Sequence, residues 1–286
     1  MILRQALGHA RKHLTTHDIE YASLESEILL RHTLGTNQVQ LYQNLNSDLS
    51  PEQEKIFWEL VNRRIKGEPT AYITEHREFF GLDFFVDSDV LIPRPESELL
   101  VEKALSLAQH RPITIVAEIG TGCGAIAIAL AVNLPQITIY AIDISAPALK
   151  VARINCERHG ITNRVHILQG DLLDPLPESV DLIIANLPYI EAEELPQPNF
   201  EPRLALDGGT GGLEKINDLC RQVNTKLHLD GYMLLEIGQG QAEAVTALLY
   251  KLYPSAKVEI TPDLSGIKRV VSMFKTSRPS PPPSPR

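Results

Sequence analysis

The sequence contains little cysteine and little tryptophan. Its 286 residues include one tryptophan and three cysteines, which are Cys123, Cys156 and Cys220. The cysteines are far apart, odd in number and form no Cys-x-x-Cys pair, so they argue against a disulfide framework and favour free thiols in a reducing compartment. A chain of this length can bury a sizeable core without such cross-links. We therefore expect a cytoplasmic protein with one large domain or two modest ones.

The chain also has a deficit of positive charge and no long apolar run. Lys and Arg number 27 against 36 Asp and Glu, which leaves a net charge of −9. A free-standing binder of duplex DNA usually has a basic surplus, because phosphate contacts supply most of its affinity. No stretch approaches the ~18 apolar residues of a membrane span, and the first residues mix polar with apolar side chains, unlike a signal peptide. We expect neither direct nucleic-acid binding nor membrane association.

Residues 1–75 have the pattern of a small helical bundle. Apolar side chains recur at helical spacing, and Gly35 is a typical helix stop. Ser50 is a good N-cap, Pro51 suits the first helical position and Gln53 completes a capping box. The pattern predicts helices over 2–14, 18–34 and 50–67.

The remainder of the chain has the pattern of an α/β fold. An aromatic, β-prone segment from Phe79 predicts a hairpin within 76–95 that links two domains. Strands then alternate with helices, which predicts a mostly parallel, Rossmann-like sheet covered on both faces, with the last strand antiparallel. The expected strands are 113–119, 137–142, 165–169, 180–185, 232–237, 257–260 and 268–274. Residues 276–286 hold five prolines and three serines and are predicted to be disordered.

A glycine-rich loop follows the first strand of this predicted sheet. Gly120, Gly122 and Gly124 alternate along it and let the backbone turn sharply and pass close to a ligand. Asp143 ends the next strand, about 20 residues on, where a carboxylate can accept hydrogen bonds from two ribose hydroxyls. Because ligands bind at the carboxyl ends of such strands, this pattern predicts a nucleoside-containing cofactor. A tight turn without a ligand is disfavoured, since the strand, the glycine loop, the following helix and Asp143 all have the positions expected of a cofactor site.

The choice of cofactor depends on the acidic residue before the loop. The loop has the spacing GxGxG, whereas a dinucleotide fingerprint is GxGxxG. Glu118 stands two residues before the first glycine and suits the ammonium group of S-adenosylmethionine, while it would repel the pyrophosphate of NAD. Asp171, which follows the third strand, is placed to accept a hydrogen bond from the adenine amine, although a turn-forming role fits its spacing equally well.

The fourth strand ends in Asn186-Leu187-Pro188-Tyr189. Asn186 offers one hydrogen-bond acceptor and two donors. Pro188 has no backbone N–H, so nearby carbonyls lack a hydrogen-bond partner in the sheet. Tyr189 offers a flat aromatic ring. These groups suit a planar NH2 group of an amide or a nucleobase, whose nitrogen is a poor nucleophile because its lone pair is delocalised. Acceptors on both N–H bonds would aim this nitrogen at an electrophilic methyl group, so that orientation supplies most of the catalysis. We predict catalytic roles for Asn186, Pro188 and Tyr189.

Together these motifs resemble those of the HemK/PrmC group of class I methyltransferases, whose members methylate the glutamine side-chain amide in the Gly-Gly-Gln loop of peptide-chain release factors. The resemblance continues through Gly67-Glu68-Pro69, Arg77-Glu78-Phe79, Leu91 to Glu98, Glu201 to Leu206, Gly208-Gly209 and Leu235 to Gly238. It implies a helical domain over 1–75 that recognises release factors, a linking hairpin over 76–95 and a methyltransferase domain over 96–275. It also implies a cytoplasmic monomer that converts S-adenosylmethionine to S-adenosylhomocysteine and modulates translation termination.

Site residues follow from the resemblance by position. It implies that Asn186, Leu187, Pro188 and Tyr189 hold the glutamine, and that the cofactor contacts Glu118, Gly120, Thr121, Gly122, Cys123, Gly124, Asp143, Asp171, Leu172 and Asn186. Leu187 stands where the family often has proline, and Leu172 where a bulky aromatic residue is common. No metal site is expected: His9, His13 and His17 recur along one helix, but a third helical ligand diverges from a tetrahedral site.

Two other functions compete with this interpretation. The same tetrapeptide pattern serves DNA enzymes that methylate adenine amino groups, but these need a basic cleft, and the net charge of −9 argues against one. A cofactor-binding module without catalysis, acting on translation through its helical domain, would not need Asn186.

Overall fold

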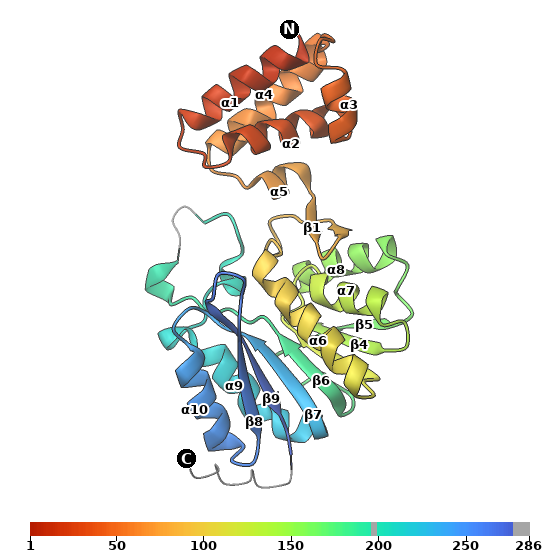
Figure 1. Cartoon of the computed structure of the whole chain (residues 1–286), viewed down its shortest axis with the longest axis vertical. Helices are drawn as coiled ribbons and strands as arrows, with labels where there is room; N and C mark the ends of the chain where they lie inside the picture. Colours follow the sequence, from red (N-terminus) through yellow and green to blue (C-terminus); the bar gives the residue numbers. More distant parts are fainter. Residues whose placement is uncertain (196–198, 277–286) are drawn as a thin grey trace. The chain divides into compact units, whose positions relative to one another are not determined.

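The computed structural model describes residues 1–195 and 199–276. The chain divides into two compact units, Met1–His76 and a larger one that begins at Arg77, and Figure 1 shows the elements of each. Apart from its first residue, the tail 276–286 that is predicted to be disordered lies outside the described residues. None of the helices in the described part is long and apolar enough to cross a membrane.

The first unit is helical, as predicted. Its helices are α1 (Leu3–Thr15), α2 (Ala22–Leu34), α3 (Gln38–Gln43), α4 (Pro51–Ile65) and α5 (Thr70–Thr74). Gly35 ends α2 in the left-handed conformation, and the Ser50 side chain caps α4 by accepting a hydrogen bond from Gln53 N at 3.1 Å. The second helix starts later than residue 18, because Asp18 has a φ of 57° and lies in the preceding turn. The short helices α3 and α5 escaped prediction because neither is long enough to show a period.

A β-hairpin opens the second unit. Strands β1 (Arg77–Phe79) and β2 (Leu82–Phe84) pair antiparallel, and both residues of the turn between them, Phe80 and Gly81, have positive φ. Two positive φ values match the twist of a two-residue hairpin turn. Phe79 and Phe84 are buried and meet edge to face at 6.2 Å, so this hairpin packs into the larger unit.

The larger unit contains the predicted α/β sheet. Seven strands lie in the order β5-β4-β3-β6-β7-β9-β8, and β9 runs antiparallel to both of its neighbours. Their bounds are β3 Ile115–Ile119, β4 Thr138–Asp143, β5 Val165–Gln169, β6 Val180–Ala185, β7 Leu227–Glu236, β8 Lys257–Pro262 and β9 Lys268–Phe274. The fold class is therefore confirmed, including the mostly parallel sheet and its antiparallel last strand.

Helices cover both faces of this sheet (Figure 1). One layer holds α6 (Glu98–His110), α7 (Ala125–Asn133) and α8 (Ala146–Arg158); the other holds α9 (Glu214–Lys226) and α10 (Ala242–Leu252). Short 3-10 turns occur at Pro95–Ser97, Ala192–Glu194, Arg203–Ala205 and Thr210–Gly212. The chain runs outward from β3 through β4 to β5 and then returns to β6 on the other side of β3. This reversal places a crevice at the carboxyl ends of β3 and β6, where α/β sheets bind ligands.

Candidate active site

The loop between β3 and α7 has three glycines with positive φ. Gly120, Gly122 and Gly124 have φ values of 72°, 55° and 85°, in the region that residues with a Cβ rarely adopt. A Cβ on Gly120 would also lie 3.3 Å from the side chain of Leu187 and 3.5 Å from the carbonyl oxygen of Asn186. The loop after β3 and the loop after β6 therefore approach each other closely at the crevice.

Glu118, near the end of β3, is tied to this loop. Its side chain is buried, with 2% exposure, and its Oε2 accepts hydrogen bonds from Thr121 Oγ1 at 2.5 Å and from Ala127 N at 3.1 Å. Burial raises the pKa of the Glu118 carboxyl to about 8, because a desolvated carboxylate is costly. The predicted contact with a cofactor ammonium stays a prediction; the observed bonds give Glu118 a role in holding the loop.

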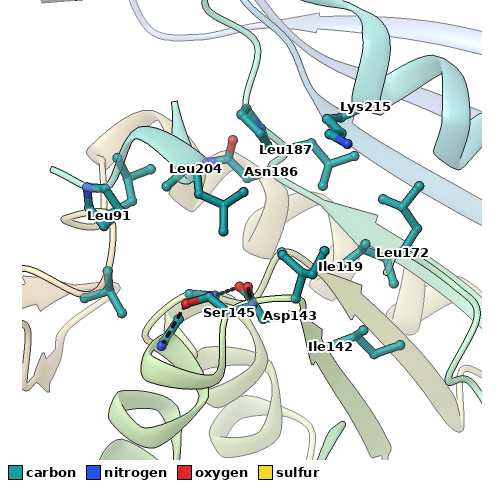
Figure 2. A pocket seen from close by; sticks show the side chains of 18 of the residues that line it. Leu91, Ile119, Ile142, Asp143, Ser145, Leu172, Asn186, Leu187, Leu204 and Lys215 are labelled. Carbon is teal, nitrogen blue, oxygen red and sulfur yellow. Dashed lines mark hydrogen bonds between the residues drawn. The ribbon is translucent and has the colours of Figure 1, made fainter. Parts of the chain in front are cut away.

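Asp143 ends β4 beside the same loop. Its two carboxylate oxygens accept hydrogen bonds from Gly122 N and Ser145 N, both at 2.9 Å. Figure 2 shows Asp143 beside Ser145 in the pocket. Burial raises the pKa of Asp143 above its ordinary value. Each oxygen of an ionised carboxylate has a second lone pair, so Asp143 can still accept from two hydroxyl groups of a ligand.

These elements line one cleft at the carboxyl edge of the sheet (Figure 2). The cleft has a volume of about 130 Å³. Of the predicted site residues, the cleft brings together Gly120, Gly122, Asp143, Asp171, Leu172, Asn186, Leu187 and Pro188. A smaller neighbouring pocket is lined by Glu118, Thr121 and Cys123 and shares Gly120, Gly122 and Asn186 with it. Gly124 and Tyr189 line neither pocket.

The apolar wall of the cleft comes from the ends of three strands. Leu172 has a φ of 46° and is buried, whereas Asp171 is exposed. Ile144 is half-exposed and lines the same cleft. Sequence reasoning missed it, although a large apolar residue directly after a strand-ending Asp is a usable signal.

Cys123, in the glycine loop, is not a nucleophile. Burial raises the pKa of its thiol to about 12, so Cys123 stays protonated.

Asn186 and Tyr189 are connected through two residues that sequence reasoning did not assign to the site. Asn186 Nδ2 donates to Ser97 Oγ at 2.9 Å, and Ser97 Oγ donates to Glu236 Oε2 at 2.6 Å. Tyr189 Oη donates to the other oxygen, Glu236 Oε1, at 3.3 Å. Burial and the nearby Glu236 charge raise the pKa of Tyr189 to about 12, so its hydroxyl stays protonated. Like Asp143, Glu236 is an acidic residue at the end of an apolar strand, which is the signal that could have found it.

The backbone of the tetrapeptide is held by contacts with Gln241 and with the segment 208–212. Gln241 Nε2 donates to the carbonyl oxygen of Tyr189 at 3.0 Å. A Cβ on Gly208 would lie 2.7 Å from the carbonyl oxygen of Pro188, and one on Gly212 would lie 2.2 Å from that of Tyr189. The two glycines allow the 208–212 segment to pack directly against residues 188–190.

His9 and His13 lie on α1 of the first unit, and His17 follows that helix. The ring centroids of His13 and His17 stack at 5.7 Å, and the described ranges contain no cluster of three or more His, Cys, Asp or Glu side chains that could hold a metal ion.

Comparison with known proteins defines the class first. Residues 95–199 match the family model described as "Methyltransferase small domain". The fold is shared with a solved methyltransferase from Pyrococcus furiosus, with a TM-score of 0.54 and 19% identity over 80% of this chain and all of that one. The chain is therefore a methyltransferase by fold and sequence, a class whose methyl donor is S-adenosylmethionine.

Comparison over the full length then defines the family. Residues 5–74 match the model described as "PrmC N-terminal domain". The "Release factor glutamine methyltransferase" of Moorella thermoacetica is 40% identical over 96% of this chain and 99% of its own length. That of Geobacter sulfurreducens is 40% identical over 94% and 95%. The chain belongs to the release factor glutamine methyltransferase (PrmC/HemK) family, which confirms the resemblance drawn from its motifs.

Proposed function

We propose that this chain transfers a methyl group from S-adenosylmethionine to the side-chain amide nitrogen of the glutamine in the Gly-Gly-Gln loop of peptide-chain release factors. The observation that carries the proposal is the orientation of Asn186. Its Nδ2 is engaged with Ser97 Oγ, which leaves Oδ1 as an acceptor at the cleft edge. The names of its relatives support the same substrate.

The residues of the cleft fit the methyl donor. Asp143 has acceptor capacity left for ribose hydroxyls, and the glycine loop exposes its backbone to the cleft. Glu118 lies in the neighbouring pocket and would hold the ammonium group; Asp171, Leu172 and Ile144 would surround the adenine. When bound, S-adenosylmethionine supplies a methyl group on a positively charged sulphur.

The tetrapeptide would hold the glutamine amide in a reactive orientation. Asn186 Oδ1 accepts one amide N–H, and a backbone carbonyl of the 186–189 segment accepts the other. With both N–H bonds held in the amide plane, the π-density of the nitrogen faces the methyl group, and orientation supplies most of the catalysis. The ring of Tyr189 covers the planar amide and excludes water. The substrate nitrogen would gain the methyl carbon as the bond of that carbon to sulphur breaks, with neutral S-adenosylhomocysteine as the other product. The methylated nitrogen then carries an acidic proton that leaves to solvent, so no strong base is needed.

The helical unit, Met1–His76, would recognise the release factor. Its match to a family-specific N-terminal model sets this chain apart from methyltransferases in general, which share only the catalytic fold. A recognition role explains why a methyltransferase with a complete cleft in its second unit carries five further helices.

The test is label transfer with three acceptors. The full chain is incubated with labelled S-adenosylmethionine and a purified release factor, the same factor with its Gly-Gly-Gln glutamine changed to Ala, or duplex DNA. We expect label on the unaltered factor alone. Equal label on the Gln→Ala factor would overturn the substrate assignment, and salt-sensitive label on DNA would favour the adenine reaction.

A further inference from the structure

One buried carboxylate connects the two functional side chains of the tetrapeptide. Glu236, at the end of β7, is 2% exposed. Its Oε2 accepts from the Ser97 hydroxyl at 2.6 Å and its Oε1 from the Tyr189 hydroxyl at 3.3 Å. Ser97, from the turn that precedes α6, is itself buried, with 4% exposure, and accepts from Asn186 Nδ2 at 2.9 Å. In the reaction proposed above, Ser97 enters only as the partner of Asn186 Nδ2, and Glu236 has no part.

The direction of each hydrogen bond in this chain follows from counting protons. A serine hydroxyl has one proton and two lone pairs. The Ser97 proton is committed to Glu236, so Ser97 can offer Asn186 only a lone pair. The Asn186 amide must therefore present its NH2 group to Ser97, and its carbonyl oxygen must face the other way. An Asn amide has no preference of its own between the two orientations, because they have nearly the same shape.

The hydrogen-bond geometry gives Glu236 the role of acceptor. Burial raises the pKa of Glu236 above its ordinary value, while the hydrogen bond from Ser97, the charge of Arg269 on the neighbouring strand β9 and the hydrogen bond from Tyr189 oppose that rise. Both carboxylate oxygens already face hydroxyl donors. An acceptor-only group at this position keeps the Ser97 proton directed away from Asn186.

We propose that Ser97 and Glu236 are positioning residues for the methyl transfer, and that they act by fixing the Asn186 amide with its oxygen toward the substrate nitrogen. This inference rests on the proposed function, since it assigns Asn186 Oδ1 to a substrate N–H. If the amide turned over, its NH2 group would face the substrate NH2 group, and two donors cannot bond. Glu236 also fixes the ring of Tyr189 by accepting from its hydroxyl, so one carboxylate orients both Asn186 and Tyr189.

The test compares Ser97→Ala with Ser97→Thr in the full chain, by steady-state label transfer to a release factor. The alanine removes the Ser97 Oγ acceptor of Asn186 Nδ2, so the amide is free to adopt both orientations. We expect kcat to fall by about tenfold or more. The Kd for S-adenosylmethionine, measured by calorimetry, and the KM for the release factor should stay within about threefold. Threonine retains the hydroxyl and should restore most of the lost kcat. Ser106→Ala, an exposed change on the adjoining α6, is the matched control.

A second pair of variants tests the part of Glu236. Glu236→Gln leaves one acceptor oxygen for two hydroxyls, so one of them must reverse its bond; we expect a lower kcat. Because both changes act on the Asn186 amide, the double variant Ser97→Ala with Glu236→Gln should lose less than the product of the two single losses. Any loss beyond that of Ser97→Ala alone measures the contact of Glu236 with Tyr189.

Several results would overturn the inference. They are an unchanged kcat in Ser97→Ala, a parallel loss of cofactor affinity, a Ser97→Thr variant as slow as Ser97→Ala, or additive losses in the double variant. If the unaltered chain transfers label to the release factor while Ser97→Ala does so equally well, only this inference fails. If the unaltered chain transfers nothing to the release factor, the proposed function fails and the inference fails with it.

Discussion

The substitution Gly208→Ala tests how precisely the tetrapeptide must be positioned for methyl transfer. Gly208 donates its backbone N–H to the carbonyl oxygen of Ile190 at 2.8 Å. In Gly208→Ala the new Cβ would lie 2.7 Å from both the carbonyl oxygen of Pro188 and Cα of Tyr189, about 0.7 Å inside ordinary contact, which begins at 3.4 Å. Both of these atoms belong to backbone, so no side-chain rotation can relieve the overlap. The tetrapeptide has to move.

The size of the effect follows from this displacement. A misplacement of about 1 Å in an oriented reaction can cost on the order of 10²-fold in rate. For Gly208→Ala we expect kcat to fall by roughly 10- to 100-fold, which corresponds to about 1.4 to 2.7 kcal/mol of activation free energy. Cofactor affinity should change little, because Asp143 and the glycine loop follow other strands.

The assay is single-turnover transfer to the release factor at saturating S-adenosylmethionine, with calorimetry for the cofactor. Gly211→Ala is the control: its Cβ would meet nothing within 4 Å, and its φ of 62° adds a backbone strain that Gly208, which has no positive φ, does not have. A smaller loss in Gly211→Ala than in Gly208→Ala would therefore come from the contact with the tetrapeptide. An unchanged rate in Gly208→Ala would refute the steric argument, and equal losses in the two variants would show that the rate responds to any strain in the 208–212 segment.

Three further outcomes follow from the geometry of the site. Because the pKa of Glu118 is about 8, binding of a cationic cofactor beside it must expel a proton at lower pH; affinity for S-adenosylmethionine should fall about tenfold per pH unit from pH 8 to 6. Calorimetry in two buffers would count that proton, and a pH-independent Kd, or a Glu118→Gln variant with the same slope, would contradict the contact. Asp143→Ala should weaken cofactor binding by about 10- to 100-fold, and unchanged affinity would remove Asp143 from the ribose site. Asn155 accepts from Phe85 N and donates to the carbonyl oxygens of Phe85 and Cys123. Asn155→Ala should cost about 2 to 4 kcal/mol of unfolding free energy in urea, and a loss below 0.5 kcal/mol would show that this connection is unimportant.

The parts of the fold that sequence reasoning predicted are those with strong local signals. Three alternating glycines predict a turn with positive φ, and they take it. The segment Ser50-Pro51-x-Gln53 predicts the start of α4, and the capping box forms there. Apolar runs predict β5, β6 and β9 over the same residues that the structure assigns to them. Of these, β6 is buried along almost its whole length, as expected of a central strand of a sheet covered on both faces.

The parts that escaped prediction depend on contacts distant in sequence. Ser97 and Glu236 are 139 positions apart and meet only when the start of α6 packs beside the end of β7. Nothing within either segment shows that the two side chains bond. The place of Glu118 shows the same limit: its spacing suggested a ligand contact, whereas the folded chain also uses its oxygen to hold Thr121 and Ala127.

In the proposed function, Asn186 presents an acceptor to a glutamine amide. Mass spectrometry of the Gly-Gly-Gln peptide, after incubation of a release factor and S-adenosylmethionine with the unaltered chain or with Asn186→Ala, is the decisive measurement. We expect one methyl group on the glutamine side chain with the unaltered chain and almost none with Asn186→Ala, while calorimetry finds the variant's cofactor affinity within about tenfold of the original. A methyl group on another residue of the factor, or equal methylation of the glutamine by both chains, would contradict it.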